Sequence, residues 1–122
     1  MSIVQTLSEA QIQTQIIDYL AARHILAFRM NTGAMVSEYK ERKRFMRFGV
    51  PGMADVLAFV MERSFPSYFT CATFDAPRPL WIEVKSATGK QSELQKSFQR
   101  QVEGYGHTYI LARSLEDVKN AL

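Results

Sequence analysis

The chain has 122 residues, of which 47% are apolar and 22% are charged. These values are typical of a globular protein and exclude fibrous repeats and intrinsic disorder. The length predicts one domain over residues 1–122, and no stretch approaches the ~20 apolar residues of a membrane span. No basic region followed by an apolar block stands at the N-terminus, so we expect no secretory signal, a cytoplasmic location and no membrane partner.

Cysteine and histidine usage narrows the possible metal sites. Cys71 is the one cysteine, which excludes an internal disulfide and a cysteine-based zinc site. The two histidines, His24 and His107, are far apart in the chain and show no metal-ligand spacing. Any bound metal is therefore expected to have oxygen ligands.

Positive charge is concentrated in one segment. The chain carries 15 Lys and Arg against 12 Asp and Glu, a net charge of +3. Five of these cations fall within eight positions, namely Lys40, Arg42, Lys43, Arg44 and Arg47. This segment is either a solvated hairpin edge, where cations discourage strand pairing, or a strand that faces nucleic acid.

The first predicted helix follows Ser8, which can cap it, and repeats apolar residues at helical spacing at Ile12, Ile16 and Leu20. At ~100° per residue, Glu9 falls within that apolar stripe. Glu9 is either a first-turn acid favoured by the helix dipole or a functional carboxylate at the end of a core-facing line.

Strands are predicted next, at residues 25–31, 41–48, 55–60 and 80–85. The first ends at the turn signal Asn31-Thr32-Gly33, and Gly49-Val50-Pro51-Gly52 makes a sharp loop before the third. Residues 63–79 contain three prolines and are predicted to be a long connection. Its aromatic residues either fold back onto the core or form an interface; they are Phe65, Tyr68, Phe69 and Phe74.

A second helix is predicted from the capping box Ser92-Glu93-Leu94-Gln95, with Leu94, Phe98 and Val102 on one face. A last strand at 108–112 and a short helix after Ser114 complete the chain. This order predicts an α/β fold with a mixed central β-sheet flanked by helices.

The segment Trp81-Ile82-Glu83-Val84-Lys85 carries the strongest chemical signal. Side chains alternate along a strand, so Glu83 and Lys85 share the face opposite Ile82 and Val84, about 7 Å apart along the strand. A Glu-x-Lys triplet by itself is also compatible with a solvated face. Trp81 is expected to be a core or dimer contact, and His107 incidental.

Asp55 strengthens the case for a site, because it begins an otherwise apolar strand directly after a glycine-rich loop. Asp55, Glu83 and Glu9 would repel one another unless a cation lay between them. Oxygen ligands without His or Cys suit Mg²⁺ or Mn²⁺, and a neighbouring Lys can balance charge on an attacked phosphate. Together these groups predict metal-assisted phosphodiester hydrolysis.

The order Gly49-Val50-Pro51-Gly52-Met53-Ala54-Asp55, then Ile82-Glu83-Val84-Lys85, then Gln95 resembles the VRR-NUC (virus-type replication-repair nuclease) domain of the restriction-endonuclease-like PD-(D/E)XK superfamily. Supporting pieces are Glu9, Arg29 to Gly33, Gly89-Lys90-Gln91 and Gly106, so the resemblance covers about residues 9–118. It implies an αβββαβ core. The loop before Asp55 is longer than the Gly-x-Pro-Asp of many members.

The resemblance also implies roles for individual residues. The metal ligands would be Glu9, Asp55, Glu83 and the backbone carbonyl of Val84; Lys85 would be the catalytic lysine and Gln95 the helix glutamine. Gln95 is equally explained by its capping box. DNA would be bound by Arg29, Asn31, Lys90 and the basic segment, although Arg29 and Asn31 also suit a turn.

The function implied is a structure-specific DNA endonuclease that depends on Mg²⁺ or Mn²⁺ and needs no organic cofactor. Stand-alone domains of this kind occur in phages and bacteria and resemble homodimeric Holliday-junction resolvases, so we expect a homodimer that acts on branched DNA. The alternatives are a non-catalytic DNA-binding module on the same fold, or a nuclease for flaps, simple duplex or RNA. The intact set of Glu9, Asp55, Glu83 and Lys85 argues against the non-catalytic module.

Overall fold

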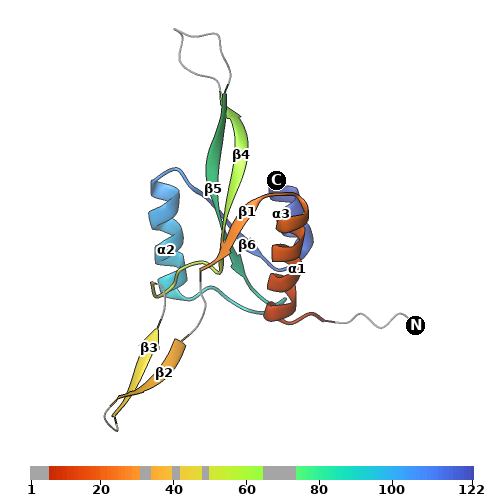
Figure 1. The fold of residues 1–122 in the computed structure, drawn as a ribbon. Helices are drawn as coiled ribbons and strands as arrows, with labels where there is room; N and C mark the ends of the chain where they lie inside the picture. The colour runs from red at the N-terminus through yellow and green to blue at the C-terminus, as the bar shows by residue number, and fades with distance from the viewer. Residues whose placement is uncertain (1–5, 31–33, 40–41, 48–49, 65–73) are drawn as a thin grey trace, which may run out of the picture.

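The structure is a computed structural model that describes residues 6–30, 34–39, 42–47, 50–64 and 74–122. Helices and strands follow one another along the chain as drawn in Figure 1. In order they are α1 (Glu9–Ala22), β1 (Leu26–Arg29), β2 (Ala34–Tyr39), β3 (Arg42–Arg47), β4 (Val56–Ser64), β5 (Phe74–Val84), α2 (Glu93–Gly104), β6 (Thr108–Ala112) and α3 (Leu115–Ala121).

The central sheet has four strands in the order β1-β4-β5-β6. β1, β4 and β5 are antiparallel neighbours, whereas β6 is parallel to β5 and is reached through the crossover helix α2. Helix α2 covers one face of the sheet, and α1 and α3 cover the other (Figure 1). This arrangement confirms the predicted α/β fold with a mixed sheet flanked by helices.

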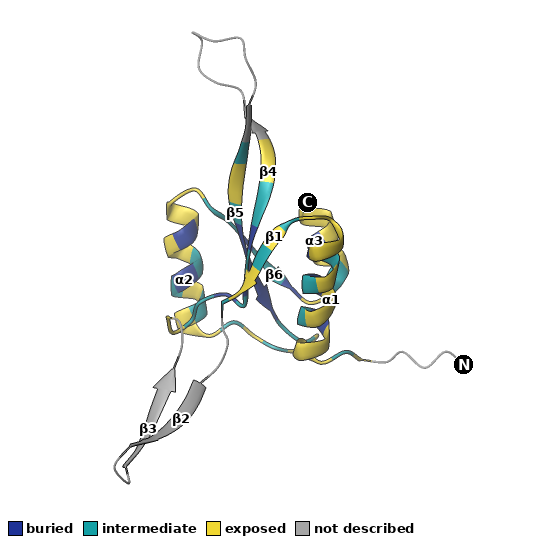
Figure 2. Ribbon diagram, viewed as in Figure 1, coloured by how far each residue is buried: buried dark blue, intermediate teal, exposed yellow. Residues whose placement is uncertain are grey.

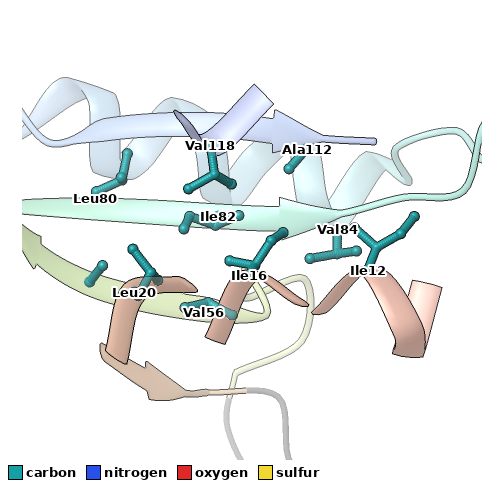
Figure 3. Packing of buried hydrophobic residues seen from close by; sticks show 10 residues of the cluster. Ile12, Ile16, Leu20, Val56, Leu80, Ile82, Val84, Ala112 and Val118 are labelled. Carbon is teal, nitrogen blue, oxygen red and sulfur yellow. The ribbon is translucent and has the colours of Figure 1, made fainter. Parts of the chain in front are cut away.

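The core consists of two clusters on opposite faces of the sheet, as strand alternation requires. The first joins Ile12, Ile16 and Leu20 of α1 to strand residues such as Ile82 and Val84 (Figure 3). The second, on the α2 face, contains Ala54, Trp81, Phe98, Val102 and Tyr109. The outer faces of the helices are exposed (Figure 2). Burial of Trp81 confirms its prediction as a core residue.

The helix ends follow the predicted caps, with one exception. Ser8 forms a capping box with Gln11, and Ser92 forms one with Gln95. Ser114 makes no side-chain cap bond to α3; the carboxylate of Asp117 accepts a hydrogen bond from the Arg113 N–H instead (2.8 Å). Of the three apolar residues predicted on one face of α2, Phe98 and Val102 are buried, whereas Leu94 is 59% exposed at the start of the helix.

Two strand predictions need correction. Residues Ala34–Tyr39 form β2, which was not predicted, and β2 pairs with β3 in a two-stranded sheet of its own. The segment 63–79 is not a simple connection, because β4 continues to Ser64 and β5 already begins at Phe74. Here β5 pairs only with β4, so Pro77 and Pro79 cost the sheet no hydrogen bond: their backbone groups face the open edge.

No helix in the described segments is long and apolar enough to cross a membrane.

Gly52 holds the loop before Asp55 against α2. Its φ is +83°, and a Cβ at this position would lie 2.4 Å from the backbone oxygen of Leu94. We expect Gly52→Ala to lower the free energy of unfolding by about 2–3 kcal/mol, because it adds left-handed strain to a backbone clash. Gly104→Ala is the matched control, since no atom would meet its Cβ within 4 Å. Equal midpoints for the two variants in urea denaturation would contradict the close approach.

Candidate active site

The Glu-x-Lys motif lies at the C-terminal end of β5, on the sheet face that packs against α2. Glu83 is 2% exposed, while Ile82 and Val84 point into the opposite core cluster. The Nζ atom of Lys85 lies 3.7 Å from Oε1 of Glu83. The predicted alternation of this strand is therefore confirmed, and it places a carboxylate and an ammonium together in a largely enclosed position.

Two further acids reach the same end of the sheet. Asp55 immediately precedes β4, and its Oδ2 accepts a hydrogen bond from the backbone N–H of Val84 (2.8 Å). Glu9, in the first turn of α1, accepts one from the backbone N–H of Ser86 through Oε1 (3.2 Å). The structure thus brings together three carboxylates that are widely separated in the sequence. It also gives Glu9 a specific contact beyond the first-turn helix effect.

Gln95 forms the predicted capping box and also contacts the Glu-x-Lys motif. Its Oε1 accepts a hydrogen bond from the Ser92 N–H (2.8 Å), which completes the capping box of α2. Its Nε2 donates to Oε1 of Glu83 (2.8 Å). The cap fixes the amide, and the fixed amide orients the carboxylate.

The environment of Glu83 disfavours its charged form. Burial is the largest cause, followed by the negative charge of Asp55, and together they raise the pKa of Glu83 to about 8. Lys85 acts in the opposite direction, whereas the charge of Glu9 adds to the rise in pKa. The Oε2 atom of Glu83 is buried and has no hydrogen-bond partner. A buried carboxylate oxygen without a partner is costly unless a proton or a cation satisfies it.

The donor set fits a hard divalent cation. In the part of the chain that the structure describes, no three His, Cys, Asp or Glu side chains lie close enough to hold a metal ion by themselves. The unpartnered Oε2 of Glu83 is nevertheless buried beside the negative charge of Asp55, an environment that a cation would relieve. Oxygen donors of this kind suit Mg²⁺ or Mn²⁺, and such ions keep several waters and need few protein ligands.

The predicted DNA-binding residues divide into three groups. Arg29 ends β1 opposite Val56, close in the sheet to Asp55, and Lys90 is exposed in the loop between β5 and α2. The basic segment forms β3, which places Arg42, Lys43, Arg44 and Arg47 in the separate two-stranded sheet. Asn31 and Lys40 lie outside the described residues.

The sequence analysis missed specific contacts of three residues. His107, expected to be incidental, accepts a hydrogen bond from the Trp81 indole through Nδ1 (3.0 Å) and stacks on its ring. Ser86 supplies the amide that binds Glu9, and Arg113 binds the loop that follows Ser86. Ser86 could have been found from its position directly after the Glu-x-Lys motif, at the end of the predicted strand. No local pattern in the sequence marks Arg113.

The chain matches no protein-family model, no curated protein and no solved structure. The resemblance to the VRR-NUC domain therefore rests on the residues quoted above.

The pKa of Glu83 predicts how stability changes with pH in metal-free protein. Folding raises this pKa from 4.5 to about 8, so between these values the folded state binds more protons than the unfolded state. The free energy of unfolding should therefore fall as the pH rises from 4.5 to 8, by at most about 1.4 kcal/mol per pH unit. Glu83→Gln, which cannot ionise, should remove this slope.

Urea denaturation in EDTA at a series of pH values from 5 to 8.5 measures the effect. Glu103→Gln removes an exposed acid from α2 and should keep the wild-type slope. A slope unchanged by Glu83→Gln would show that Glu83 is ionised in the folded protein throughout this range.

Proposed function

We propose that this protein is a divalent-metal-dependent DNA endonuclease that hydrolyses phosphodiester bonds. The observation that carries the proposal is the buried Glu83, whose Oε2 lacks a partner although Lys85, Gln95 and Asp55 surround it. An ion pair with Lys85 alone would engage only Oε1 of Glu83 and would leave Oε2 buried without a partner, which destabilises the folded state. A cation between the acids accounts for the whole group.

Glu83, Asp55 and Glu9, with the backbone carbonyl of Val84, would hold the cation. A bound divalent cation supplies a Lewis acid for phosphate oxygens and a water of lowered pKa. Lys85 carries the compensating positive charge, placed to stabilise the negative charge that develops on the phosphate. Gln95 keeps the Glu83 carboxylate in one orientation.

The test is cleavage of a panel of labelled substrates that includes linear duplex, flaps, forks and four-way junctions. Mg²⁺ or Mn²⁺ should support cleavage, EDTA should abolish it, and Ca²⁺ should allow binding without cleavage. RNA duplex and single strands belong in the same panel. Absence of cleavage of every nucleic acid, with binding retained, would favour the non-catalytic module over the enzyme.

We further propose that the protein acts as a homodimer on branched DNA, because two symmetric cuts in a four-way junction need two sites. Of the four aromatic residues that suggested an interface, Phe65, Tyr68 and Phe69 lie outside the described residues, and Phe74 is the first residue of β5. The described residues add exposed apolar side chains on the open part of the sheet, at Leu26 (60%), Phe28 (47%) and Met61 (62%). Exposed apolar patches of this kind favour association.

Sedimentation equilibrium at micromolar concentration should therefore give twice the chain mass of 14.0 kDa. Phe28→Glu should shift the mass toward that of the monomer and convert paired cuts in a junction to single nicks. A wild-type protein that is monomeric with and without junction DNA would contradict the dimer but not the nuclease.

A further inference from the structure

Arg113 binds the loop that follows the Glu-x-Lys motif. β6 is parallel to β5 with Val84 opposite Ala112, so the residues after both strands emerge at the same end of the sheet. From there the Nη1 atom of Arg113 donates hydrogen bonds to the backbone carbonyls of Ser86 (2.6 Å) and Gly89 (2.8 Å), with Ala87 at 3.4 Å. The Arg113 backbone is itself fixed by the Asp117 carboxylate. One guanidinium thus binds both ends of the loop 86–89.

This loop lies directly against the site. Ser86 donates its N–H to Oε1 of Glu9 and offers its carbonyl to Arg113, so Ser86 connects the two side chains. A Cβ on Gly89 would lie 3.2 Å from the same Glu9 oxygen and 3.4 Å from Cδ of Lys85. The position of the loop therefore limits where the Glu9 carboxylate and the Lys85 side chain can lie.

Arginine suits this role because its planar guanidinium presents several donors in a fixed geometry. All of the contacts here come from Nη1, whose two N–H groups have fixed directions in the guanidinium plane, whereas a lysine ammonium of the same charge rotates freely. Carbonyls bound by a cation also gain from a charge-assisted hydrogen bond, which is stronger than a neutral one. Arg113 thus offsets the entropy that is lost when the loop is ordered.

We propose that Arg113 is a positioning residue: it holds the loop 86–89 against Glu9 and so sets the Glu9 carboxylate relative to Asp55 and Glu83. The inference rests on the proposed function, because the consequence of this placement is metal binding and phosphodiester cleavage. Groups that orient metal-binding carboxylates through hydrogen bonds typically contribute about 10–100-fold to metal affinity or activity.

The test compares Arg113→Ala with Arg23→Gln. Arg23 is an exposed arginine at the end of α1, so its variant removes one positive charge without touching the loop. Mn²⁺ affinity, measured by electron paramagnetic resonance of the free ion, should fall about tenfold or more in Arg113→Ala and stay unchanged in Arg23→Gln. The cleavage rate kcat should fall in parallel, while KM for DNA stays within about twofold of the control.

Two further variants separate positioning from general damage. Millimolar guanidinium added to Arg113→Ala should restore part of the Mn²⁺ affinity, because it can occupy the place of the missing side chain. A variant whose fold is damaged would not recover in this way. Gly89→Ala should also lower the Mn²⁺ affinity, because the added methyl group would crowd the Glu9 carboxylate from the loop. Arg113→Lys keeps the positive charge and should fold, with a loss of Mn²⁺ affinity between those of wild type and Arg113→Ala. It replaces Arg113→Ala in the test if that variant does not fold.

Normal Mn²⁺ affinity in both Arg113 variants, with an active wild type, would overturn the inference and leave the nuclease intact. A loss in DNA affinity without a change in Mn²⁺ affinity would also overturn it, since Arg113 would then be a phosphate contact. A wild type that neither binds Mn²⁺ nor cuts nucleic acid would overturn the proposed function, and the role of Arg113 with it.

Discussion

Asp55→Asn, Glu83→Gln and Lys85→Ala are each expected to lower the rate of DNA cleavage at least 100-fold. The three groups lie at one end of the sheet, where Asp55 accepts from the Val84 N–H and Lys85 lies 3.7 Å from Glu83. Metal and water positioning supplies several kcal/mol of transition-state stabilisation, and each ~1.4 kcal/mol corresponds to a factor of ten in rate. Single-turnover cleavage with saturating enzyme measures the chemical step directly.

Each substitution has a matched control elsewhere on the molecule. Glu62→Gln removes an exposed carboxylate that pairs with Arg78, and Lys96→Ala removes an exposed ammonium from α2. Both should keep near-normal cleavage. DNA binding in Ca²⁺ should persist in all three site variants, because we expect most phosphate contacts to come from other residues. Near-normal cleavage by any folded member of the trio would show that the site is assigned to the wrong residues.

Replacing Arg42, Lys43 and Arg44 together by Gln should weaken binding to every DNA sequence. These residues are consecutive in β3, in a sheet separate from the four-stranded core, so their loss should leave the core intact. Each phosphate contact contributes about 0.9 to the slope of log affinity against log salt. The slope should therefore decrease by up to about 2.7, and affinity at low salt should fall about tenfold or more.

The control removes the same charge from the four-stranded sheet and its helices: Arg23, Arg78 and Lys119 are replaced together by Gln. These cations lie on α1, β5 and α3. Fluorescence anisotropy over a range of salt concentrations distinguishes the two triple variants. Equal salt slopes for the β3 variant and the wild type would identify the basic segment as a solvated edge, the other interpretation of its charge.

The parts of the fold that the sequence predicted are those set by local rules. The cap at Ser8 and the capping box at Ser92 predicted the starts of α1 and α2, and alternation placed Ile82 and Val84 opposite Glu83. The spacing that places Leu94 on the face of Phe98 and Val102 does not show which turns of α2 are covered, and Leu94 in the first turn is exposed. The first half of β5 was predicted as a connection because it contains Pro77 and Pro79. Whether a strand tolerates a proline depends on which edge of the sheet the proline backbone faces, and the sequence does not show this.

The candidate site was predictable as a set of residue types but not as a geometry. Glu83, Lys85 and Gln95 are close in sequence, and their contacts follow from one strand and one cap. The hydrogen bond between Glu9 and Ser86 spans 77 positions, and the bonds of Arg113 to the loop span 24 to 27. Contacts at these separations depend on strand order and on a parallel crossover, which no local spacing encodes.

The β2–β3 pair is inserted between two strands that are already neighbours. β1 and β4 pair through Arg29 and Val56, and the Met30 N–H donates to the Asp55 carbonyl at the point where the chain departs and returns (2.8 Å). The two ends of the insertion are therefore held together by the core sheet itself. Lengthening a loop between such fixed ends adds little to the entropy cost of folding. The β2–β3 pair can therefore be replaced by another segment, in natural variants or by design, while Asp55 keeps its position. Choice of substrate and bond-breaking chemistry would then be free to diverge independently.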